Sequence, residues 1–208
     1  MTEAITDARP RRALRGTLFV AALVVLAILV SVRYEVGEQP PGDELRRDPG
    51  SYGWHTSKDV GSILTDGLNL ISVTPQARAP LRLISARPLM DSGGAVRMIG
   101  ILARVNPDML PPGYKVSAVQ SSPGFPPVHP DLAGAVPVNG LIVAPPKPGE
   151  PRWIELQIGY EVVAPGRSTR RGVELVYEYE GARHKALIPS YLAVCAPSTA
   201  TCQPEYDT

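Results

Sequence analysis

Residues 16–32 form an uncharged, apolar run that directly follows a segment containing four arginines. At about 1.5 Å per residue, a helix over this run covers roughly 26 Å, so residues 13 and 14 must join it to cross a ~30 Å hydrocarbon core. A single segment in lipid satisfies its backbone hydrogen bonds only as a helix. The sequence therefore predicts a transmembrane helix over residues 13–33.

A secretory signal peptide, which is cleaved, also combines a basic start with an apolar run. The residues after the run, 31–35, contain no small-x-small cleavage site, and no cysteine follows closely enough to accept a lipid. A buried core helix would carry an apolar stripe, whereas this run is apolar on all sides. We therefore favour a retained signal anchor over both alternatives.

Basic residues are distributed unevenly around the predicted span. Four arginines precede the apolar run 16–32, whereas Arg33 alone follows it before Arg46. Because Lys and Arg are retained on the cytoplasmic side, we predict a cytoplasmic basic tail over residues 1–12. Everything after residue 33 is then extracytoplasmic, in a single-pass protein of the cell membrane whose first partner is the lipid bilayer.

The charge of the exported part is nearly balanced. Four of the 21 basic and two of the 20 acidic residues precede residue 33, which leaves 17 against 18. This balance argues against a nucleic-acid partner. The 23 prolines and 19 glycines in 208 residues suit short strands and many turns better than long helices.

The bias toward proline, alanine, arginine and glycine, with one N-terminal span, resembles the single-pass envelope proteins of high-GC Gram-positive bacteria. The resemblance covers the layout of the chain. It implies an extracytoplasmic immunoglobulin-like domain, and it carries over no functional residue.

Residues 34–67 are polar, with proline-glycine turns at residues 40–43 and 48–50. Such a composition predicts a stalk or linker with little fixed structure. Within it, a short helix over residues 60–64 and docking of Tyr52 and Trp54 on the domain are two alternatives to an irregular chain.

Alternating and apolar runs separated by Pro or Gly clusters follow the predicted stalk. They include residues 68–73, 81–86, 95–105 and 138–143, and the clearest is 153–163, where every second side chain is apolar. These runs predict an all-β domain over residues 68–195, an immunoglobulin-like antiparallel β-sandwich of about seven strands.

Residues 173–180 and 183–188 predict a hairpin around Gly181 and Ala182. A glycine in the first central position suits a type II′ turn, which would pair Glu178 with Lys185 and Tyr177 with Ala186. The glutamates, Arg183 and Lys185 then share a solvent face, while the tyrosines face the core.

Cys195 and Cys202 are the two cysteines of the chain, and both lie on the exported side. An oxidising compartment favours a disulfide between them. Closing this short loop is expected to stabilise the fold by roughly 2.5 kcal/mol in the chain-entropy model. The C-terminal tail, residues 196–208, is thereby tied to the last strand.

Prolines crowd residues 106–151, which predicts long, stiff loops around a strand at 116–119. Loops of this kind on a rigid sandwich often carry recognition, and Tyr114, Phe125 and His129 form a candidate interaction loop. Alternatively, the prolines only stiffen the loops and lower the entropy of the unfolded chain.

No catalytic residue, cofactor-binding residue or metal ligand is assigned by the sequence. Residues 91–94 resemble the nucleophile motif of chymotrypsin-like serine proteases, but Met90 stands where that family has glycine, and a hairpin connection accounts for the same letters. Candidate copper ligands are scattered in the sequence. They are His55, His129, His184, Met90, Met98 and Met109.

We therefore expect a non-catalytic interaction or assembly module of the cell envelope, with an envelope protein as its partner. One alternative is an exported domain that binds copper or another small ligand. A second alternative is an envelope enzyme whose site is assembled from distant strands.

Overall fold

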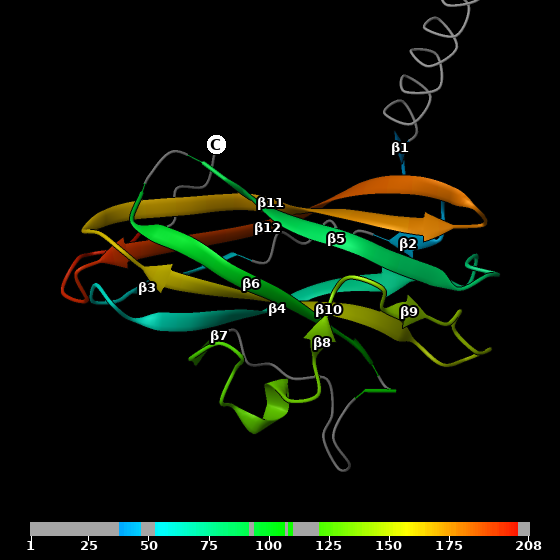
Figure 1. The fold of residues 1–208 in the computed structure, drawn as a ribbon, viewed down its shortest axis with the longest axis horizontal. Helices are drawn as coiled ribbons and strands as arrows, with labels where there is room; N and C mark the ends of the chain where they lie inside the picture. The colour runs from blue at the N-terminus through cyan, green and yellow to red at the C-terminus, as the bar shows by residue number, and fades with distance from the viewer. Residues whose placement is uncertain (1–37, 47–52, 92–93, 107, 110–120, 204–208) are drawn as a thin grey trace, which may run out of the picture. The chain divides into compact units, whose positions relative to one another are not determined.

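The computed structural model describes residues 38–46, 53–91, 94–106, 108–109 and 121–203 (Figure 1). Its regular elements there are strands and one 3₁₀ turn, η1 (Pro130–Leu132), so the prediction of an all-β domain is confirmed. Within these ranges no helix is long and apolar enough to span a bilayer. The predicted transmembrane helix, the basic tail, Tyr52, Tyr114 and the strand at 116–119 lie outside the described residues.

Two six-stranded sheets make up this β-sandwich. The first sheet has the order β1-β12-β11-β5-β9, with β3 beside β12, and the second has the order β2-β4-β10-β6-β8, with β7 beside β4. The strands of the first sheet are β1 (Glu38–Gln39), β3 (Gly53–Ser57), β5 (Leu81–Met90), β9 (Ile142–Val143), β11 (Gly166–Tyr179) and β12 (Ala182–Ala196). Those of the second are β2 (Leu45–Arg46), β4 (Ile63–Val73), β6 (Val96–Asn106), β7 (Ser121–Pro123), β8 (Val136–Pro137) and β10 (Arg152–Val162).

The core lies between the two sheets and follows the alternation in the sequence. Ile154, Leu156 and Ile158 of β10 face Leu175 and Tyr177 of β11 across the sandwich, and all are fully buried. Burying a large apolar side chain contributes about 1.5–3 kcal/mol, so this alternating pattern is the main source of stability. The strands predicted within residues 68–105 and 153–188 are confirmed.

The outer face of β10, which carries the polar side chains of this strand, is also largely buried. Glu155 and Gln157 are as buried as the apolar residues between them, because residues 121–137 lie over this face. Figure 1 shows β7 and β8 on the side of the second sheet that faces away from the first.

The predicted stalk over residues 34–67 is wrong where the structure describes it, because β1 pairs with β12 and β2 pairs with β4. β3 pairs in parallel with β12, and β4 already begins at Ile63, where a short helix was expected. Leu64 is buried in the core. Trp54 packs against the core, so the predicted docking of Trp54 on the domain is confirmed. Packing against the two sheets outweighs the polar, turn-rich local sequence, so the domain begins earlier than residue 68.

The hairpin forms, but its register is shifted by two residues from the prediction. Tyr177 pairs with His184 and Glu178 with Arg183, so the turn is centred on Glu180 and Gly181. Both central residues have positive φ, 49° and 79°, which corresponds to a type I′ turn rather than type II′. A shift of two preserves the side-chain alternation, so the predicted core and solvent faces are correct.

Candidate functional site

A buried polar cluster joins the two sheets through Arg170 of β11. Arg170 forms an ion pair with Asp66 of β4, and both side chains are almost completely buried. The same guanidinium donates from Nη1 to the Tyr160 hydroxyl (3.3 Å) and from Nη2 to Asn69 Oδ1 (3.0 Å) and Ser190 Oγ (2.7 Å). Its Nε donates to the Ser190 carbonyl (3.2 Å), so every N–H of Arg170 has an acceptor.

The acidic partner in this inter-sheet cluster is equally well bonded. Asp66 accepts hydrogen bonds from Trp54 Nε1 (2.7 Å) and Asn69 Nδ2 (2.8 Å). Burial raises the pKa of Tyr160 to about 12, although Arg170 opposes this shift. Burial alone would lower the pKa of Arg170, but its attraction to Asp66 and Tyr160 outweighs that and raises it. The cluster therefore stays as an ion pair with a neutral tyrosine, and its donors are used within the fold.

Residues 121–137, which we call the cover segment, are fixed to the outer face of the second sheet by Phe125. The phenyl ring lies over Gly100 of β6 and Gly159 of β10, where an added Cβ would come within 2.5 and 2.4 Å of ring atoms. Thr65 Oγ1 donates to the Gly124 carbonyl at 2.5 Å beside it. Two glycines on adjacent strands thus form the notch that receives the aromatic ring.

Polar side chains hold the other end of the cover segment. Arg104 and Glu155 form a fully buried ion pair at 2.5 Å, and Arg104 Nη1 donates to the Ala133 carbonyl at 3.0 Å. Gln157 Nε2 donates to the carbonyl of the fully buried Leu132 at 2.9 Å. Unlike the inter-sheet cluster, this layer is incompletely bonded: Arg104 Nη2, Glu155 Oε1 and Gln157 Oε1 have no hydrogen-bond partner in the part of the chain that the structure describes.

Apolar side chains are exposed around the turn of the cover segment. Val128 is 70% exposed, Ile63 43% and Ile99 37%. The Gly124 amide donates to the Ile63 carbonyl (3.0 Å), and Ile99 lies beside Gly159 next to the Phe125 ring. We call Ile63, Ile99, Phe125 and Val128 the apolar patch. Backbone hydrogen bonds and the Phe125 ring connect it to the second sheet.

An open groove of about 750 Å³ lies elsewhere, between the edge formed by β2 and β4 and the loop before β10. Arg46 and Lys147 are exposed at its rim, while Arg152 is buried and pairs with Asp108 in a bidentate geometry. Arg152 Nε has no partner among the described residues. The groove is lined by Arg46, Ser72, Val73, Thr74, Pro75, Gln76, Pro146, Lys147, Pro148, Gly149, Glu150, Pro151, Arg152 and Trp153.

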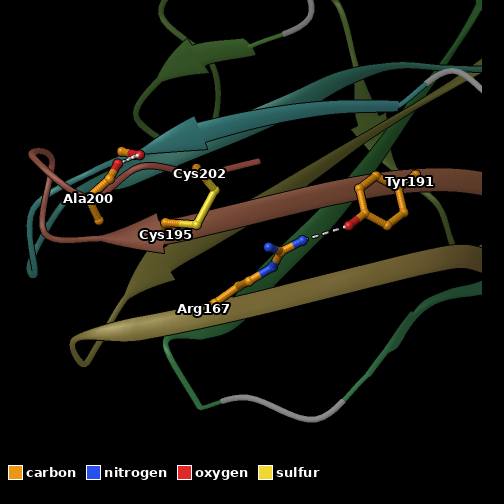
Figure 2. The surroundings of a disulfide bond; sticks show 6 residues. Arg167, Tyr191, Cys195, Ala200 and Cys202 are labelled. Atoms are coloured by element: carbon orange, nitrogen blue, oxygen red, sulfur yellow. Dashed lines mark hydrogen bonds between the residues drawn. A yellow bond between two sulfur atoms is a disulfide. The ribbon is translucent and has the colours of Figure 1, made fainter. Parts of the chain in front are cut away.

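The predicted disulfide between Cys195 and Cys202 is confirmed (Figure 2). It closes a loop whose Ala200 carbonyl accepts a hydrogen bond from Ser57 Oγ at 2.6 Å. The Ser198 amide donates to Asp59 Oδ1 at 2.9 Å, and this bond lowers the pKa of the Asp59 carboxyl. On the next strand, Arg167 Nη2 donates to the Tyr191 hydroxyl at 3.0 Å. The bridge therefore ties the segment after β12 back to that strand, and the two hydrogen bonds connect this segment to β3 and its following loop.

Two residues of the candidate interaction loop, Phe125 and His129, are described by the structure, and both lie in the cover segment. Phe125 is half-buried in its notch, and His129 Nδ1 accepts the Asp131 amide (3.2 Å) at the start of η1. The more exposed contact group, Val128, was not singled out from the sequence. No local sequence signal distinguishes Val128. The notch could have been predicted only from the pairing of Gly100 with Gly159, and that pairing is known only once the register of β6 and β10 is known.

Two of the other candidate copper ligands have structural contacts, whereas His55, Met90 and Met98 are exposed. His184 stacks on Tyr177 at 5.4 Å, and its Nδ1 lies 3.0 Å from the Pro40 carbonyl. Met109 Sδ accepts the Val105 amide at 3.2 Å. Across the described ranges no three His, Cys, Asp or Glu residues are grouped to hold a metal ion.

The residues that resemble a protease motif also have a structural role where they are described. The Asp91 carboxylate accepts hydrogen bonds from Thr169 Oγ1 (2.9 Å) and Arg171 Nε (2.8 Å) of β11. Ser92 lies outside the described residues.

These features define a two-sheet β-sandwich with a buried ionic cluster between its sheets, a proline-rich cover segment and an open, partly basic groove. No protein-family model matches the chain, and no curated protein matches it significantly.

Proposed function

We propose that the chain is a membrane-anchored, extracytoplasmic and non-catalytic interaction module of the cell envelope. The observation that carries this proposal is the exposed apolar patch on the fixed cover segment. An apolar cluster with a polar rim is typical of protein contact surfaces, and here Arg97 and Glu161 supply an ion pair on the same sheet. Because Phe125 and Leu132 already hold the segment in place, a partner would not have to order it.

The strand order supports an immunoglobulin-like domain. In the constant-type sandwich, strands A-B-E-D form one sheet and G-F-C the other. The orders β2-β4-β10-β6 and β12-β11-β5 match these two sheets when the seven strands are taken in chain order. The buried pair of Arg170 and Asp66 then joins strands F and B, the two strands that a disulfide joins in antibody domains.

The connection to the predicted anchor is short. β2 is already bonded to the sandwich, because Leu45 pairs with Val73 and the Thr74 amide donates to the Glu44 carbonyl at 2.9 Å. From residue 33 to residue 38 an extended chain reaches at most about 18 Å. This tether supports a module that meets its partners close to the bilayer, rather than one displayed on a long stalk.

Site-specific photo-crosslinking of the full chain in native membranes tests the proposal. A crosslinking residue at Val128 is expected to give one reproducible protein adduct, whereas the same residue at Arg183, exposed on the other sheet, gives none. Replacing Ile99 with glutamate should abolish the Val128 adduct at unchanged protein level, because it places a charge in the apolar patch. The matched change Leu187→Glu, at an exposed apolar residue of β12, should leave it intact.

The proposal fails if Val128 and Arg183 give the same adducts, or if Ile99→Glu and Leu187→Glu reduce the Val128 adduct equally. Either result would mean that the apolar patch is not a specific contact surface.

A further inference from the structure

We infer that the groove between β2, β4 and the loop before β10 binds the anionic headgroup of a phospholipid from the bilayer that holds the anchor. This inference rests on the proposed membrane anchoring and names a ligand for a different surface of the domain from the apolar patch.

The charges of the groove favour an anion. Among its lining residues, Arg46, Lys147 and Arg152 are basic and Glu150 is acidic. Asp108 neutralises part of Arg152, but the Arg152 Nε donor lacks a partner among the described residues although the side chain is only 3% exposed. A buried charge with an unsatisfied donor is costly, so the Arg152 guanidinium would gain from an anion that the exposed Arg46 and Lys147 hold in the groove.

The walls of the groove suit an amphiphilic ligand. Trp153 and four prolines, at positions 75, 146, 148 and 151, give it rigid apolar sides next to the basic rim. Tryptophan is enriched where the hydrocarbon of a bilayer meets the headgroups, because its ring is apolar and its N–H is polar. A phospholipid headgroup has both an anionic phosphodiester for the basic rim and a glycerol backbone for the apolar walls. Free phosphate would contact only the basic side chains.

The groove also lies within reach of the membrane. Arg46 follows residue 33 by thirteen positions, so even an extended chain keeps it within about 45 Å of the predicted span. The segment holding Arg46 is locked to the sandwich, since Glu44 is buried and accepts a hydrogen bond from the Tyr177 hydroxyl. Surface potentials fall off within about 10 Å, so attraction to the headgroups requires Arg46 and Lys147 to contact the bilayer surface.

Lipid binding to the purified full-length chain tests this inference. The protein is released from detergent micelles into a native mass spectrometer after titration with short-chain phosphatidylglycerol or phosphatidylcholine. Phosphatidylglycerol is expected to bind more tightly, and the double variant Arg46→Glu/Lys147→Glu should weaken its binding on the order of tenfold. Both residues are exposed, so the unfolding midpoint of the variant should match that of the unmodified chain.

The matched control is Arg183→Glu/Lys185→Glu, which reverses two exposed charges on the opposite sheet. It should keep phosphatidylglycerol affinity within about twofold, since neither residue lines the groove. Equal weakening in both double variants, or equal affinity for the two lipids in the unmodified chain, would overturn the headgroup site.

Failure of the inference is distinguishable from failure of the proposed function. If the chain resists carbonate extraction from membranes but shows no groove-dependent lipid binding, the anchor stands and the headgroup site is wrong. If the chain is extracted by carbonate, the membrane-anchored module is wrong and the inference falls with it.

Discussion

Replacing Arg170 with methionine is expected to lower the free energy of unfolding by about 3–5 kcal/mol. The substitution leaves the Asp66 carboxylate buried without its cation, and it removes a hydrogen-bond donor from Tyr160, Asn69 and Ser190. Urea unfolding followed by tryptophan fluorescence measures the change, because Trp54 donates to Asp66 in the same cluster.

The neighbouring residue supplies the control. Arg171 pairs with Asp91 at 2.8 Å, but its side chain is 65% exposed. An exposed pair of this kind is worth about 0–1 kcal/mol, so Arg171→Met should change stability little. A loss at Arg170 no larger than that at Arg171 would contradict the role of the inter-sheet cluster in holding the sandwich together.

Arg104→Met is expected to cost about 3 kcal/mol, because it leaves Glu155 as a buried, unpaired carboxylate. The double variant Arg104→Met/Glu155→Leu should recover most of that loss. This layer already contains polar atoms without partners, and an apolar pair of similar volume removes two of them, Arg104 Nη2 and Glu155 Oε1.

A double-mutant cycle on the unfolding free energy measures this recovery. The exposed pair Arg97 and Glu161, at 2.5 Å on the same sheet, serves as the reference, with an expected coupling below about 1 kcal/mol. If the double variant Arg104→Met/Glu155→Leu proves less stable than Arg104→Met alone, the unsatisfied polar atoms of this layer do not cost stability.

The sequence predicted correctly those strands in which apolar and polar side chains alternate. β10 and the outer and inner faces of the hairpin follow directly from side chains that alternate between apolar and polar. β3 and the start of β4 were missed because residues 53–66 lack that local signal. Their strand conformation depends on pairing with β12 and β10, which are more than 90 positions away in the chain.

The hairpin turn shows how a single residue decides register. Gly181 alone suggested a glycine in the first central position, yet Glu180 occupies that position with φ 49°. A left-handed glutamate is unfavourable locally, and the pairing of Tyr177 with His184 and of Glu178 with Arg183 along two long strands outweighs it. The strand contacts, rather than the turn residues, set this register.

The candidate surfaces were less predictable than the strands. The proline-rich region was correctly expected to form irregular loops, but its attachment depends on Gly100 and Gly159, which become neighbours only through the register of β6 and β10. The groove likewise combines Arg46 with Lys147, which lies about 100 positions later in the chain. Such sites arise from tertiary pairing and leave no spacing that a motif could detect.

The disulfide was predictable because the two cysteines are close in the sequence and lie after the predicted span. Its contacts with Ser57 were not, since they depend on the placement of β3.

The topology of the chain in intact cells shows whether the β-sandwich lies outside the cell membrane, as we propose. A C-terminal epitope tag is probed with an impermeant protease, and the cysteines are probed with a thiol-reactive polymer after denaturation without reductant. We expect the protease to remove the tag from intact cells. We expect Cys195 and Cys202 to react only after reduction. A protected tag together with two freely reactive thiols would contradict both expectations.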